Sequence, residues 1–204
     1  AGLHLVPFAA FIGGLGVTLL LYQLATRGGQ TSVAVLLLAG IALAAFAGAA
    51  TGILIYLADD RQLRDVTFWS MGSLAGASWG KIASALPLIL PALLAAPFLA
   101  RGLNALALGE AQALHLGIRV QLLKRLAIFV TAASTGAAVA ISGGIGFIGI
   151  VVPHLLRLTC GPDHRALLPQ SALLGAALLI GADMIARSIV APAELPIGIV
   201  TACL

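Results

Sequence analysis

Apolar runs separated by short polar segments make up most of this chain. Residues 1–26 contain no Asp, Glu, Lys or Arg. At about 1.5 Å per residue, a helix of that length crosses the roughly 30 Å hydrocarbon core of a bilayer. The same pattern predicts further membrane-spanning helices over residues 33–58, 82–100 and 126–141, and another that starts near residue 171.

One apolar piece, residues 145–156, is too short to span a bilayer by itself. The pair Gly143-Gly144 separates it from the preceding run, and its length corresponds to only about 18 Å of helix. It is either lengthened by residues 157–159 or a partly broken helix in the protein interior. Beyond the last full span, two prolines lead into an incomplete final helix, so the sequence is interpreted as a piece of a longer protein.

The polar segments predict what lies at the two sides of the membrane. Residues 59–65 are the most polar part of the chain, and they are followed by Trp69 and Trp79, a residue type that settles at membrane interfaces. Residues 101–125 form the longest polar excursion on the opposite side, and glycines interrupt it. We expect two short amphipathic helices in that excursion.

Composition confirms that the chain belongs in a membrane. Hydrophobic residues make up 61% of the sequence and charged residues 9%, against about 25% charged residues in soluble domains. A soluble fold could not keep this much apolar surface out of water. The net charge of +4 comes from basic residues in short loops, so it indicates orientation in the bilayer and excludes nucleic-acid binding.

Basic residues are divided unequally between the two predicted sides. One side holds seven of them, namely Arg27, Arg101, Arg119, Lys124, Arg125, Arg157 and Arg165. The other side holds four, namely Arg61, Arg64, Lys81 and Arg187. Because loops with more Lys and Arg stay in the cytoplasm, the first side is predicted to be cytoplasmic.

Two nucleotide-binding patterns can be excluded. Gly144, Gly146 and Gly149 match the GxGxxG string, but they lie within a membrane run rather than between a strand and a soluble helix. These glycines are interpreted as permitting close helix approach and a break in the helix. No Walker A sequence is present, because Lys81 is followed by Ile82. If ATP drives this protein, another chain binds it.

Enzymatic chemistry lacks a suitable set of residues. The four histidines are scattered, and Asp183 has no second aspartate with which to share a proton. Cys160 and Cys203 form neither a CxxC motif nor a disulfide framework. We therefore predict no catalytic residue, no metal site and no cofactor bound by this chain.

Asp183 and Arg187 are unusual because charges near a bilayer are costly and mark function by default. They stand four residues apart with the acid first, the favourable order for a helical ion pair. A structural pair at a helix end is an equally valid interpretation.

Small residues recur every four positions in the second predicted span. Gly40, Ala44, Gly48 and Gly52 share one helical face, which would let another helix approach closely. The alternative is that they reflect only the high Ala and Gly content of the chain.

Several motifs in this order resemble one known family. They are GGIGFIGIVVPHLLRL from Gly143, DHRALLP from Asp163, ADMIAR around Asp183, AELPIGIVTA around Glu194, and LNALALGEAQALHLG from Leu103. Together they resemble the permease subunits of iron-complex and cobalamin ABC importers, and TFWSMGSLAGASW from Thr67 is most similar to the haem permeases.

The resemblance implies an all-α type II importer permease bundle in the bacterial inner membrane. The full subunit would have ten transmembrane helices, of which residues 1–204 resemble helices four to nine and the start of ten, as one transmembrane domain. It would work as a homodimer in the lipid bilayer, with two cytoplasmic ATPase subunits that bind ATP and Mg²⁺. A periplasmic substrate-binding protein would complete the importer.

The resemblance also assigns roles to particular residues. Residues 103–120 would form a cytoplasmic coupling loop, and its contacts with the ATPase would come from Leu106, Leu108, Gly109, Glu110, Ala113, Leu114 and Gly117. The binding protein would dock on Arg187, Glu194 and Arg61. The helix hinge beside the transport path would comprise Gly143, Gly144, Gly146, Gly149 and Pro153. Residues 59–79 would form an outer gate.

The expected function is import of haem or a ferric chelate, driven by ATP hydrolysis in other subunits. Import of cobalamin is the alternative within the same family. An ATP-independent channel or carrier and an intramembrane enzyme are the alternatives from other classes.

Overall fold

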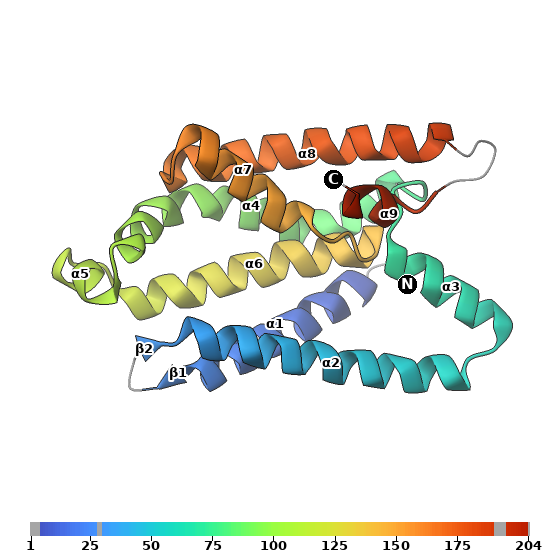
Figure 1. Ribbon diagram of the computed structural model, residues 1–204, viewed down its shortest axis with the longest axis horizontal. Coiled ribbons are helices and arrows are strands. Elements are labelled where there is room, and N and C mark those ends of the chain that lie inside the picture. Colours follow the sequence, from blue (N-terminus) through green and yellow to red (C-terminus); the bar gives the residue numbers. More distant parts are fainter. Residues whose placement is uncertain (1–4, 28–29, 190–194, 204) are drawn as a thin grey trace.

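The computed structural model describes residues 5–27, 30–189 and 195–203, and these form a bundle of helices that lie roughly lengthwise (Figure 1). Two strands of two residues pair antiparallel between the first two helices. The elements are α1 (Leu5–Ala25), β1 (Thr26–Arg27), β2 (Gln30–Thr31), α2 (Val33–Leu57), α3 (Asp60–Met71), α4 (Trp79–Ala107), α5 (Glu110–His115), α6 (Val120–Ser142), α7 (Ile148–Cys160), α8 (His164–Ile189) and α9 (Ile197–Ala202).

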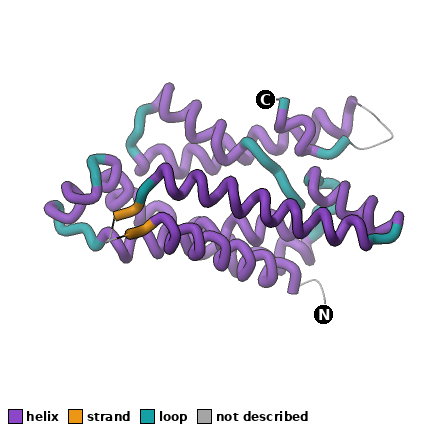
Figure 2. The backbone as a smooth tube through the Cα atoms, turned by 60° about the horizontal axis from the view of Figure 1, so that its bottom comes forward, coloured by secondary structure: helices purple, strands orange, loops and turns teal. Residues whose placement is uncertain are grey.

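Helix α6 is the centre of the bundle, because it packs on α1 along one side and on α4 along another. Helix α8 packs on α4 and forms an antiparallel pair with α7. Helix α2 lies on the outside of the bundle next to α1 (Figure 2). Among the described residues, α2, α4, α6 and α8 are long and apolar enough to cross a bilayer. The prediction of a multi-pass helical membrane protein is confirmed.

Alanine is the commonest residue among the described buried positions, and many large apolar residues face outward. Ala85, Ala113 and Ala137 are at most 1% exposed, whereas Phe46 and Phe98 are 76% and 85% exposed. In a bilayer the lipid tails are as apolar as leucine, so helices associate by close van der Waals packing of small side chains. This distribution is the one expected for a protein whose solvent is lipid.

Local capping explains where helices begin next to water. Asp59 accepts a hydrogen bond from the main-chain amide of Gln62 (2.8 Å), and the Gln62 side chain accepts one from the amide of Asp59 (3.2 Å). This reciprocal capping box starts α3 directly after α2 ends. The most polar segment of the sequence is therefore a helix at one end of the bundle.

The two ends of the bundle carry different elements (Figure 1). The β1–β2 pair, α5 and the turn between α7 and α8 gather at one end, which we term the inner end. Helices α3 and α9 and the last turn of α8 lie at the opposite, outer end. The division of the chain into two sides is that expected from the sequence, and the cytoplasmic assignment of the inner end remains a prediction.

Several predicted boundaries were wrong or incomplete, among them the start of α6, which lies at Val120 rather than near 126. Helix α4 exceeds the predicted 82–100 at both ends, and α8 begins at His164 rather than near 171. The polar excursion holds one short helix, α5, instead of two, because residues 103–107 continue α4. Helix α7 is lengthened to Cys160 and is not broken at Pro153, yet its 13 residues reach only about 20 Å.

Candidate functional site

Three segments that are far apart in the sequence meet at the outer end through their main chains. They are the end of α3, the loop between α6 and α7, and the start of α9. The hydrogen bonds run from the amide of Ser73 to the carbonyl of Ser142 (2.8 Å), from Gly144 to Trp69 (3.3 Å) and from Ile197 to Gly72 (3.1 Å). We term residues 69–73, 142–144 and 197–198 the outer junction.

Glycines make the outer junction possible. A Cβ atom on Gly143 would overlap the carbonyl oxygen of Trp69, and one on Gly198 would overlap that of Met71. Gly143 and Gly72 also have φ angles of +73° and +72°, a region that side chains disfavour. The predicted hinge glycine Gly143 therefore serves a close backbone contact that ties α6 to α3.

Gly144 is also closely packed, because a Cβ atom built on it would lie 2.9 Å from the carbonyl oxygen of Ser70. The remaining predicted hinge residues lie in more open surroundings. Nothing lies within 4 Å of a Cβ built on Gly146 or Gly149, and Pro153 lies within α7. Between those glycines, Phe147 has φ +67° and ψ −43°, and the amide of Ile148 donates to the carbonyl of Gly146 (2.8 Å). This is a γ-turn of the rare, strained kind. No residue type in the sequence signals it, and it was missed.

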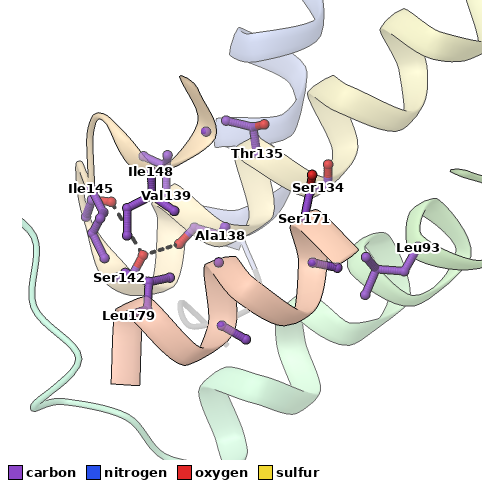
Figure 3. A pocket seen from close by; sticks show the side chains of 15 residues that line it. Leu93, Ser134, Thr135, Ala138, Val139, Ser142, Ile145, Ile148, Ser171 and Leu179 are labelled. Atoms are coloured by element: carbon purple, nitrogen blue, oxygen red, sulfur yellow. Dashed lines mark hydrogen bonds between the residues drawn. The ribbon is translucent and has the colours of Figure 1, made fainter. Parts of the chain in front are cut away.

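A cleft of about 580 Å³ separates α6 from α7 and α8 next to the outer junction (Figure 3). Small and hydroxyl side chains line it, including Ser134, Thr135 and Ser142 from α6 and Ser171 from α8. The Ser171 hydroxyl oxygen is buried and has no hydrogen-bond partner in the described part of the chain. Residues of α6 and α8 line the cleft together, and α8 packs on α4.

Helix α5 at the inner end is held between the end of α4 and the start of α6. Ala113 is fully buried and packs with Ala105 of α4 and Val120 of α6. Glu110 forms an ion pair with Lys124 of α6 at 2.6 Å, with its side chain 27% exposed. Of the predicted coupling residues, Ala113 and Glu110 thus fix α5 to its neighbours.

The remaining predicted coupling residues turn the chain or face outward. Gly109 and Gly117 adopt φ angles of +111° and +77°, which glycine tolerates, and they delimit α5 on both sides. Leu108 and Leu114 are 66% and 61% exposed. Leu106 is partly buried against the cluster of Ala105, Ala113 and Val120. Leu108 at the end of α4 and Leu114 on α5 therefore expose apolar side chains at the inner end.

Of the predicted docking residues, the two that the structure describes both lie at the outer end. Arg187 forms an ion pair with Asp183 through its Nε atom at 2.8 Å, and the two side chains are 46% and 24% exposed. Arg61 is exposed in the first turn of α3. Glu194 lies outside the described residues. The pair therefore exists, and the Arg187 side chain is still accessible enough to meet a partner.

This arrangement defines a multi-pass α-helical membrane protein. Its sequence matches the FecCD transport family over residues 1–204, and the chain belongs to that family. The predicted resemblance is confirmed.

Several relatives can be compared with the whole chain. The Hemin transport system permease protein HmuU of Yersinia pestis is 50% identical over 201 residues, which are 98% of this chain and 59% of the relative. The Cobalamin import system permease protein BtuC of Halobacterium salinarum is 43% identical over 95% of this chain and 52% of its own length. The chain thus spans less than two thirds of these relatives.

A solved structure has the same fold. It is an ABC transporter assigned to the metal-chelate type in an inward-facing conformation, and it superposes with a TM-score of 0.83 at 30% sequence identity. The match covers 99% of this chain and 71% of that one. The arrangement of helices described above is therefore shared with a transporter.

Substitution at the outer junction should destabilise the protein. Gly143→Ala places a methyl group against the carbonyl oxygen of Trp69 at a φ angle of +73°, and such strain costs about 1–3 kcal/mol. We expect the melting temperature of the detergent-purified protein to fall by several degrees.

Gly146→Ala is the matched control, because it lies in the same loop with open space around it. Its melting temperature should stay close to that of the unsubstituted protein. Equal melting temperatures for both variants would show that the close contact at Gly143 contributes nothing to stability.

Proposed function

We propose that the chain is the membrane-spanning part of an ATP-driven importer that moves haem or a related iron chelate into the bacterial cytoplasm. The observation that carries this proposal is the 50% identity with a hemin permease over 98% of the chain. Import of cobalamin is the second candidate, because cobalamin permeases are 42–44% identical over a similar share.

A homodimer in the inner membrane is part of the proposal. Helix α2 has no buried residue in its apolar stretch, and its described contacts are mainly with α1. Nothing lies within 4 Å of a Cβ built on Gly40, Gly48 or Gly52. A face of small residues that is open in the bilayer suits the approach of another helix, so α2 is assigned to the contact between subunits.

The partners in water would bind at opposite ends. Leu108 and Leu114 at the inner end offer apolar side chains to a cytoplasmic ATPase, as an apolar helix face suits a groove. Arg61 and Arg187 at the outer end offer positive charge to acidic residues of a periplasmic binding protein. Glu194 belongs to the same proposed docking surface by its position in the sequence.

The chain itself would carry out no chemical step and hold no cofactor. ATP and Mg²⁺ would bind in the partner subunits, and their binding must favour one arrangement of the helices over another, because a ligand shifts a conformational equilibrium only through differential affinity. The permease supplies the path and the moving parts. Hinge residues from Gly143 to Pro153 are assigned to the outer half of that path.

Reconstitution tests the proposed substrate directly. The complete protein is placed in proteoliposomes with its ATPase and binding protein, and import of haem and of cobalamin is measured with and without ATP. We expect ATP-dependent import of haem, and stimulation of ATP hydrolysis by the haem-loaded binding protein. Import of cobalamin alone would favour the second candidate, and uptake without the ATPase would indicate a channel or carrier.

The proposed ATPase contact predicts the effect of a charge on α5. Leu114→Glu replaces an exposed apolar side chain in the proposed interface, and loss of such a contact weakens binding by about tenfold or more. The affinity of the ATPase for the purified permease measures the effect.

His115→Ala serves as the control, because His115 is the next residue on the same helix and is exposed but outside the proposed contact. The affinity of the ATPase for the His115→Ala variant should be close to that for the unsubstituted permease. If Leu114→Glu binds the ATPase as tightly as the unsubstituted protein, α5 is not the coupling element.

A further inference from the structure

Two groups of helices at the inner end have separate cores. Ala105, Ala113 and Val120 join the end of α4, α5 and the start of α6 into what we term the coupling corner. Val152, Leu156 and Leu167 join α7 to α8, which we term the α7–α8 pair. Each group is fixed internally by buried apolar contacts, so each can respond as a unit to a force at its surface.

Asn104 connects the coupling corner to the α7–α8 pair. It lies on α4, next to the buried Ala105, and its Nδ2 donates to Oδ1 of Asp163 at 2.6 Å. Its Oδ1 accepts from the main-chain amide of His164 at 2.9 Å and lies 2.7 Å from Nδ1 of the same residue. Because an amide oxygen only accepts, Nδ1 carries the proton in this contact. Both the nitrogen and the oxygen of the Asn104 side-chain amide are therefore hydrogen-bonded.

Asp163 makes this contact part of the start of α8. Its Oδ1 also accepts from the amide of Arg165 at 2.9 Å, and its carbonyl accepts from that of Leu167 at 2.9 Å, which is the geometry of a helix N-cap. The hydrogen bond from Arg165, and then that from Asn104, lower the pKa of the Asp163 carboxyl below its usual value. The carboxylate form that accepts both bonds is thus favoured.

The contact of Asn104 with Asp163 and His164 lies at the start of α8, so a change there can affect the whole helix. Helix α8 has 26 residues and extends about 39 Å from Asp163 to the outer end, where it carries Asp183 and Arg187. The cleft lies beside α8 between Ser171 and Leu179. A displacement of the coupling corner is therefore passed to α8 at its first turn and along its contact with α4.

We propose that Asn104 is a positioning residue that transmits movement of α5 to α8, so that nucleotide binding at the inner end changes the outer end. This role rests on the proposed importer function. Asn104 contacts neither the ATPase nor the substrate in this account. It acts through Asp163 and His164.

The test uses the complete importer in proteoliposomes with haem as the transported probe. In Asn104→Ala the hydrogen bonds to Asp163 and His164 are lost. Import per ATP hydrolysed should fall about tenfold, within the usual range of coupling energies, while basal ATP hydrolysis stays within about twofold of its original rate. A fall in import per ATP with unchanged basal hydrolysis indicates a defect in transmission, because a defect in folding or assembly would lower hydrolysis as well.

Exchange of the Asn104 and Asp163 side chains provides a sharper comparison. Asn104→Asp alone opposes two carboxylates, so it should uncouple import as Asn104→Ala does. Asn104→Asp combined with Asp163→Asn exchanges donor and acceptor and keeps a good N-cap residue before α8. This double variant should recover most of the import per ATP.

Thr159→Ala is the matched control, because Thr159 lies at the same turn but its hydroxyl donates to carbonyls of its own helix. It should leave the ratio unchanged. The role of Asn104 is refuted if import and hydrolysis fall in proportion, or if Asn104→Ala imports haem normally. If the unsubstituted complex imports neither haem nor cobalamin, the proposed function fails, and the role of Asn104 fails with it.

Discussion

Close main-chain contact at the outer junction is the constraint on which the rest of the arrangement depends. The bilayer core offers no water to unpaired amides and carbonyls, so a chain that leaves one helix and enters another must bond them within the protein. Gly143 and Gly198 permit this by letting main chains approach to distances that a Cβ atom would forbid. Helices α3, α6 and α9 are fixed to one another in this way.

The consequence for the bundle is an unequal pattern of attachment. The α7–α8 pair is joined to α6 through the loop at the outer junction, and it is joined to the coupling corner through Asn104 at the inner end. Between these points the pair borders the cleft, and α8 packs on α4. The proposed transport function requires at least two arrangements of the helices, and a helix pair beside an open cleft is suited to small relative displacements.

The sequence predicted the apolar helices well, because a bilayer imposes length and composition on every span. It failed at helix ends: residues 103–107, 120–125 and 164–170 adjoin polar segments and were expected in loops. They are helical because α4, α6 and α8 pack on other elements there. Gly143 was identified as a break, but its contact with Trp69 joins residues 74 positions apart and cannot be read from local pattern. Asn104 carried no signal of its own, since a single amide near a helix end has many possible roles.

Displacement of α8 relative to α6 is the central claim, and a distance between spin labels measures it. Labels on cysteines at Thr131 of α6 and Leu173 of α8, both exposed, report across the cleft once the native cysteines are replaced. A second pair at Thr131 and Leu94 of α4 serves as the reference within the central helices. In the complete importer, ATP binding should change the first distance by more than about 2 Å and leave the second unchanged. An α6–α8 distance that is the same with and without ATP would contradict the account.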